Sequence, residues 1–162
     1  MYPWLVFLHV LGAFAFVMAH GASANVAFRL RHESSRERIA ALLDLSNTYL
    51  NAMYAGLLLL LIGGVVAGFA GNWWGQGWIW LSLAILVAQA IAMYAMGTQR
   101  FGTLRKAAGL PYFANMRPQP PAASAGDEEL AALARAFNPI PVAAVGFGGL
   151  ALILWLMMFK PF

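Results

Sequence analysis

Four long runs of apolar residues divide the chain, and the stretches between them hold nearly all of its charge. The first run continues for about 24 residues, enough for a helix to cross a hydrocarbon core about 30 Å thick. The other three runs are of similar length and composition. We therefore predict an all-α fold, an integral membrane four-helix bundle. The predicted spans are residues 3–28, 49–70, 78–98 and 139–159, with polar loops at 29–48 and 99–138.

The polar loops contain further local signals. Ser34 and Glu37 have the spacing of a capping box, and the amphipathic stretch that follows predicts a surface helix continuous with the second span. Asp127 places an acidic group where a helix N-terminus favours one, which predicts a short helix to about Phe137. Residues 117–126 are rich in Pro, Ala and Ser and lack apolar periodicity, so we expect a mobile loop there.

Composition and charge support a membrane location. Of the 162 residues, 62% are hydrophobic and 10% are charged, so the excess apolar surface must face lipid or a very large partner, and lipid is the simpler interpretation. No basic residue precedes the first apolar run, which favours a retained helix over a cleaved signal peptide. Nine of the ten Lys and Arg residues lie in the two polar loops, and only Lys160 lies on the other side. The positive-inside rule then predicts cytoplasmic loops, with the N-terminus and the C-terminus outside.

The inventory of side chains excludes several functions. The chain has no cysteine, which rules out disulfides, thiolate metal sites and iron–sulfur clusters. No phosphate-binding loop or hydrolase motif is present. The net charge of +4 is explained by topology, so we expect no nucleic acid partner. Glycines in every span predict close packing of helices, with a homo-oligomer or a membrane complex as further alternatives.

His9 and His20 are the strongest candidates for chemistry, because polar groups inside a membrane span are costly and usually face the bundle interior. Eleven residues separate them, about 20° past three full turns, so both imidazoles share one helix face about 16 Å apart. Imidazoles at two depths on one helix are typical of b-type cytochromes. We therefore predict haem b, with these histidines as metal ligands.

The remaining predicted site residues are those that could complete a metal site with the histidines or form hydrogen bonds with them. No other span contains a histidine, so a methionine such as Met93 or Met96 is the obvious sixth ligand. A tyrosine, an open site or a histidine from a second subunit would also serve. Copper is the alternative metal, since imidazole with thioether suits it. Without a cofactor, each histidine needs a hydrogen bond to a neighbouring helix, and Gln89 or Tyr94 could provide it.

Two polar clusters lie near the ends of the second and third spans. Asp44, Asn47, Asn51 and Tyr54 recur at helical spacing, which predicts either a polar vestibule for a cofactor or the wet face of a surface helix. Arg100, Arg105 and Lys106 form the second cluster. It could bind anionic lipid or haem propionates, or act only as a topology signal.

The N-terminal residues carry a family resemblance through the motif Met1-Tyr2-x-Trp4-x-x-x-Leu8-His9-Val10. It resembles the start of HemJ-type protoporphyrinogen oxidases, which are small haem-binding membrane proteins. Leu8-His9-Val10-Leu11-Gly12 and the four-span layout are also similar to the copper-resistance protein D group and to uncharacterised integral-membrane families. The resemblance implies a bacterial inner (plasma) membrane protein in which His9 matters most.

Two functions follow as expectations. The first is a haem-b-binding membrane protein in electron transfer or porphyrin oxidation. If such a protein is an enzyme, it is a membrane oxidoreductase. The alternative is a non-catalytic membrane complex subunit or a copper-handling protein.

Overall fold

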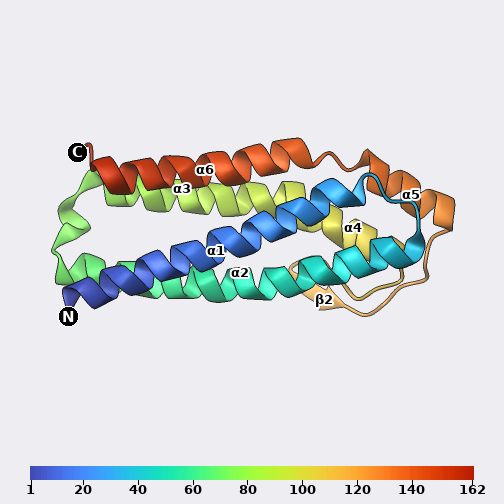
Figure 1. Cartoon of the computed structure of the whole chain (residues 1–162), viewed down its shortest axis with the longest axis horizontal. Coiled ribbons are helices and arrows are strands. Elements are labelled where there is room, and N and C mark those ends of the chain that lie inside the picture. The colour runs from blue at the N-terminus through green and yellow to red at the C-terminus, as the bar shows by residue number, and fades with distance from the viewer.

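The computed structural model of the protein describes all 162 residues and is mostly helical, which confirms the predicted all-α class. Four long helices form the body of the molecule (Figure 1). The elements are α1 (Tyr2–Leu30), α2 (Arg36–Ala70), the 3₁₀ turn η1 (Trp73–Gly75), α3 (Gly77–Met93), the π-helical turn η2 (Tyr94–Thr98), α4 (Gln99–Ala107), β1 (Tyr112–Ala114), β2 (Arg117–Gln119), α5 (Asp127–Ala136) and α6 (Pro139–Phe159).

Four helical segments are long and apolar enough to cross a membrane: α1, α2, the continuous run from α3 to α4, and α6. The 29 residues of α1 extend about 44 Å at 1.5 Å per residue, more than a hydrocarbon core requires. Large apolar side chains such as Met18 and Phe69 point outward and are 73% and 68% exposed. The chain is therefore a multi-pass membrane protein whose helices present an apolar surface to lipid.

The helices extend past the predicted spans where polar residues are good helix formers. Helix α2 begins at Arg36, as the amphipathic pattern predicts, and the third segment continues through η2 to Ala107. Polarity marks where a helix leaves the lipid and does not by itself end the helix. The predicted helix at Asp127 is confirmed as α5.

The prediction of an unstructured centre at 117–126 is wrong for its first three residues. They form β2, which pairs antiparallel with β1. Asn115 and Met116 connect the strands with φ values of 51° and 62°, the backbone that a two-residue hairpin turn requires. A strand of three residues is too short to show a periodic pattern.

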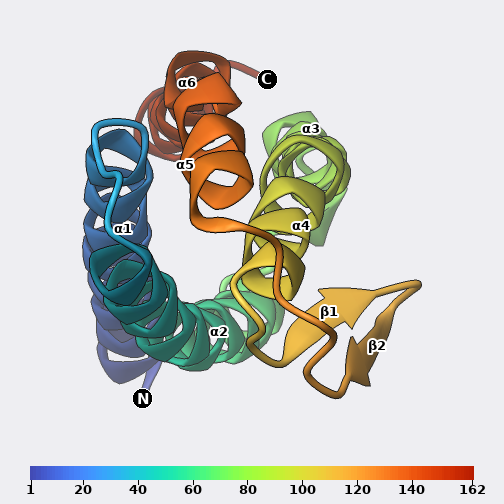
Figure 2. The ribbon, with the colours of Figure 1, turned by 90° about the vertical axis from the view of Figure 1, so that its right-hand side faces the viewer.

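The long helices pack as two pairs, α1 with α2 and α3 with α6. Figure 2 shows α1 and α2 on one side of the molecule and α3 and α6 on the other. The helices of a pair pack more extensively with each other than with the other pair. Both chain termini lie at one end, here called the terminal end (Figure 1). Helices α4 and α5 and the hairpin lie at the other, here called the loop end.

Three glycines let α1 and α2 meet backbone to backbone, and we call this contact the glycine interface (Gly12, Gly56 and Gly63). A Cβ added at Gly12 would lie 2.8 Å from the Cα of Leu60, which is closer than real Cβ contacts come. A Cβ at Gly56 or Gly63 would lie 2.7 Å from a backbone nitrogen of α1. The predicted role of glycine in close packing is therefore confirmed for this pair.

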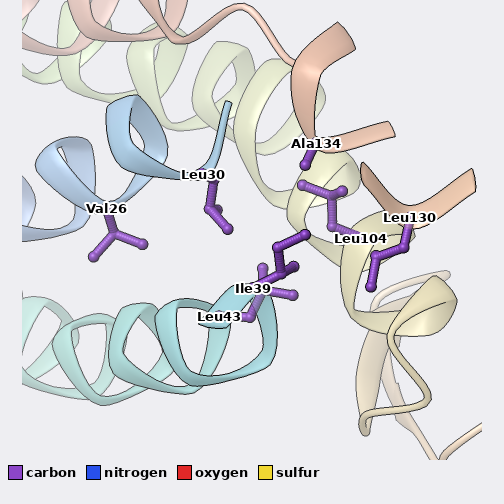
Figure 3. Packing of buried hydrophobic residues seen from close by; sticks show 7 residues of the cluster. All are labelled: Val26, Leu30, Ile39, Leu43, Leu104, Leu130 and Ala134. Carbon is purple, nitrogen blue, oxygen red and sulfur yellow. The ribbon is translucent and has the colours of Figure 1, made fainter. Parts of the chain in front are cut away.

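Apolar side chains form a separate core at the loop end (Figure 3). They come from α1, α2, α4 and α5, and Leu30, Ile39 and Leu130 are completely buried. We call this cluster the loop-end core, and its members are Val26, Leu30, Ile39, Leu43, Leu104, Leu130 and Ala134. It holds α5 against the ends of the spanning helices.

Polar contacts stabilise the segments that connect the helices around this core. Arg36 pairs with Asp127 at 2.6 Å and also donates to the carbonyl of Ala125. The carboxylate of Glu33 accepts from the backbone N–H groups of Ser34 and Ser35. The bond from Ser35, followed by that from Ser34, lowers the pKa of Glu33, because both favour the charged carboxylate.

Candidate functional site

His9 lies in the packed interface between α1 and α2. Its Nδ1–H donates to the carbonyl oxygen of Leu60 at 2.7 Å. Gly64 makes room for the ring, because a Cβ there would lie 2.6 Å from Nδ1. His9 therefore has a hydrogen-bond partner on a neighbouring helix, although the partner is a backbone carbonyl and not Gln89 or Tyr94.

His20 has a different environment, although it lies on the same helix. The residue is only 7% exposed, and its ring stacks on Phe16 with centroids 6.0 Å apart. Phe147 of α6 covers it edge-on at 5.1 Å. The Nε2 atom is buried against Gly146 and has no hydrogen-bond partner. An imidazole nitrogen of this kind is costly in an apolar interior and calls for an explanation.

Gln89 of α3 reaches the same part of α6. Its Nε2 donates to the carbonyl oxygen of Gly146 at 2.7 Å, while its Oε1 is buried without a partner beside Gly149. The two glycines are therefore contact points for polar side chains from α1 and α3. Sequence reasoning assigned them only to helix packing.

A cleft of about 510 Å³ lies between the two helix pairs and extends to the hairpin at the loop end. Most of the residues that line it are hydrophobic. Its walls include His20 and Gln89, and the predicted residues Met93 and Tyr94 also line it. Met53 of α2 completes a set of possible ligands in one space.

Three of the predicted site residues do not line the cleft: His9, Met96 and Asn51. Helix α1 runs obliquely across α2 (Figure 1), so its His9 face meets α2 while the same face near His20 borders the cleft. Asn51 is exposed on α2 and is not part of the cleft wall. Met96 lies within η2, and Tyr94 and Gly97 of the same turn do line the cleft.

The polar groups at the loop end of the cleft are organised around Arg105. Its Nη1 donates to Asp44 at 2.9 Å and to the carbonyl of Leu43 at 3.0 Å. Its Nε donates to the carbonyl of Pro111 at 2.6 Å. Asn47 and Tyr54 of the predicted vestibule also line the cleft. The separation of 61 residues between Asp44 and Arg105 hid this contact from sequence reasoning.

Carboxylates and imidazoles are too dispersed to form a metal centre by themselves. The chain contains no group of three or more His, Cys, Asp and Glu side chains that could hold a metal ion. Any metal bound in the cleft would therefore need ligands of other types in addition to His20.

No known protein family, curated protein or solved structure matches the chain. Its class therefore follows from the fold and the site alone. It is a multi-pass membrane protein of four long helices with an amphipathic cleft between two helix pairs.

Proposed function

We propose that the protein binds haem b in the cleft, with His20 as an iron ligand, and acts in electron transfer or porphyrin oxidation. The observation that supports this most strongly is the buried Nε2 of His20, which has no hydrogen-bond partner although the residue is part of the wall of a largely apolar cleft. A neutral imidazole nitrogen is a common axial ligand of haem iron.

The other residues of the cleft suit the same group. A volume of about 510 Å³ falls within the range of pockets that hold cofactors. Met53 and Met93 could offer thioethers as further iron ligands, and Arg105 could offer a cation for the propionates. The Nε2 edge of His20 rests on Gly146, so coordination requires the ring to turn or α6 to move aside.

The protein would contribute position, polarity and exclusion of water. Phe16 stacks on the imidazole, Phe147 packs against it edge-on, and the wall of the cleft is mostly hydrophobic, which would limit water around a bound group. When bound, the haem iron would supply one-electron redox chemistry. The proposed setting is a bacterial inner membrane, with the loop end toward the cytoplasm on the basis of its basic residues.

An absorption spectrum of the detergent-purified protein, oxidised and dithionite-reduced, tests the proposal. We expect a Soret band with reduced α and β bands in the wild type, and its loss in His20→Ala. Met93→Leu tests whether the thioether of a residue that lines the cleft takes part in haem binding. Met96→Leu is its matched control, because Met96 does not line the cleft. A colourless wild type after expression with added haem precursor would contradict haem binding. Copper analysis of the same preparation would then test a site of His20 with Met53 or Met93.

A further inference from the structure

The side chain of Arg105 is partly buried and has unused hydrogen-bonding capacity. Its side chain is 14% exposed, and the residue forms part of the cleft wall. A guanidinium has five N–H groups. Three of them are used, by Pro111, Leu43 and Asp44, and all three come from Nε and Nη1. The two N–H groups of Nη2 have no partner in the protein, and Nη2 is not among the buried unpaired atoms.

The charge of Arg105 has only one protein counter-ion, and that counter-ion is weakly held. The carboxylate of Asp44 is 60% exposed, so water competes for it. The two backbone carbonyls fix the direction of the guanidinium without neutralising it. This arrangement leaves a preorganised cation beside an apolar space.

We propose that Arg105 binds the acidic group of an amphiphilic ligand whose apolar body occupies the cleft. The chemical class is a carboxylate on a large apolar framework, which Nη2 would bind through a charge-assisted hydrogen bond. This inference rests on the proposed function for the identity of the framework, a tetrapyrrole with propionates. The acid-binding role of Arg105 can be tested separately from it.

The test uses two probes that share one ring system and differ in whether their carboxyl groups are free or esterified. Protoporphyrin IX and its dimethyl ester share one ring, but the ester has no free carboxylate. Binding to the full chain in detergent micelles is followed by porphyrin fluorescence anisotropy, with protein-free micelles as the baseline. We expect Arg105→Gln to weaken binding of the acid by tenfold or more and to leave binding of the ester unchanged.

Two further variants separate binding from folding. Arg100→Gln removes the same charge from an exposed residue that does not line the cleft, and we expect no change in affinity. Asp44→Asn removes the competing carboxylate while keeping an oxygen acceptor for Nη1. It should therefore tighten binding of the acid several-fold. A purely structural salt bridge would make Asp44→Asn and Arg105→Gln change binding in the same direction.

The outcomes distinguish this inference from the haem proposal. Equal effects of Arg105→Gln and Arg100→Gln, or weaker binding in Asp44→Asn, would overturn the role of Arg105 even if porphyrins bind. If neither porphyrin binds, the proposed function fails, and the same variants are compared with oleate and oleyl alcohol. Oleate binding that depends on Arg105 would then uphold the acid site, and binding that does not depend on it would overturn the site.

Discussion

The two ends of the molecule are held together by different kinds of contact. In the terminal half, α1 and α2 meet through glycines with almost no side chain between the backbones. At the loop end, leucine and isoleucine side chains form a buried core with an exposed ion pair beside it. This difference in packing follows from the surroundings of each region, lipid in one case and water in the other. Lipid supplies no hydrophobic driving force between helices, so close backbone contact is used there, whereas water favours burial of apolar side chains.

The cleft lies between the glycine interface and the loop-end core, where neither backbone contact nor buried apolar side chains fill the space. Beyond the glycine interface, α1 carries His20 toward α6 and not toward α2. The loop-end core closes the far side of this region through α4 and α5. The same helix can therefore carry one histidine with a structural partner and one without.

The largest expected effect comes from blocking the glycine interface. Gly12→Ala places a methyl group against the backbone of Leu60, which cannot move without moving α2. We expect a loss of about 3 kcal/mol in the free energy of unfolding, the upper end for overpacking. Gly148→Ala is the control, since its Cβ would meet no atom within 4 Å. Thermal or denaturant unfolding in one detergent compares them, and equal stability of the two variants would contradict backbone contact.

The loop-end core should respond to the opposite change, a loss of volume. Leu130→Ala removes a fully buried side chain of α5, and we expect it to cost about 2.5 kcal/mol. Because α5 lies outside the spanning helices, the loss should release α5 while α1 and α2 stay packed. Hydrogen exchange would show faster exchange in α5 with unchanged protection near Gly12. Faster exchange throughout α1 and α2 would mean that the two regions are not independent.

The ion pair beside the core should matter least. Asp127 is 74% exposed, so Asp127→Asn should cost at most about 1 kcal/mol even though its contact with Arg36 is short. Glu128→Gln changes an acid in the same first turn of α5 that has no salt bridge. The difference between the two melting temperatures isolates the pair. It should shrink at high salt, and a difference independent of salt would contradict an electrostatic origin.

The sequence predicted the number of helices well because span length and apolar composition are local properties. It also identified His20, Gln89, Met93 and Tyr94, which do line one cleft. It could not show which of His9 and His20 borders the cleft, because their surroundings depend on how α1 crosses α2. The sequence named Arg105 as a candidate but could not predict its contacts, since its partners Leu43 and Asp44 are distant in the chain.

The contrast between the two histidines is the central claim, and one paired measurement tests it. His9→Ala and His20→Ala are purified side by side and compared for haem content per protein and for melting temperature. We predict that His9→Ala keeps its haem but melts at a lower temperature, because it loses the bond to Leu60. His20→Ala should lose its haem. Loss of haem in His9→Ala with full retention in His20→Ala would contradict the account.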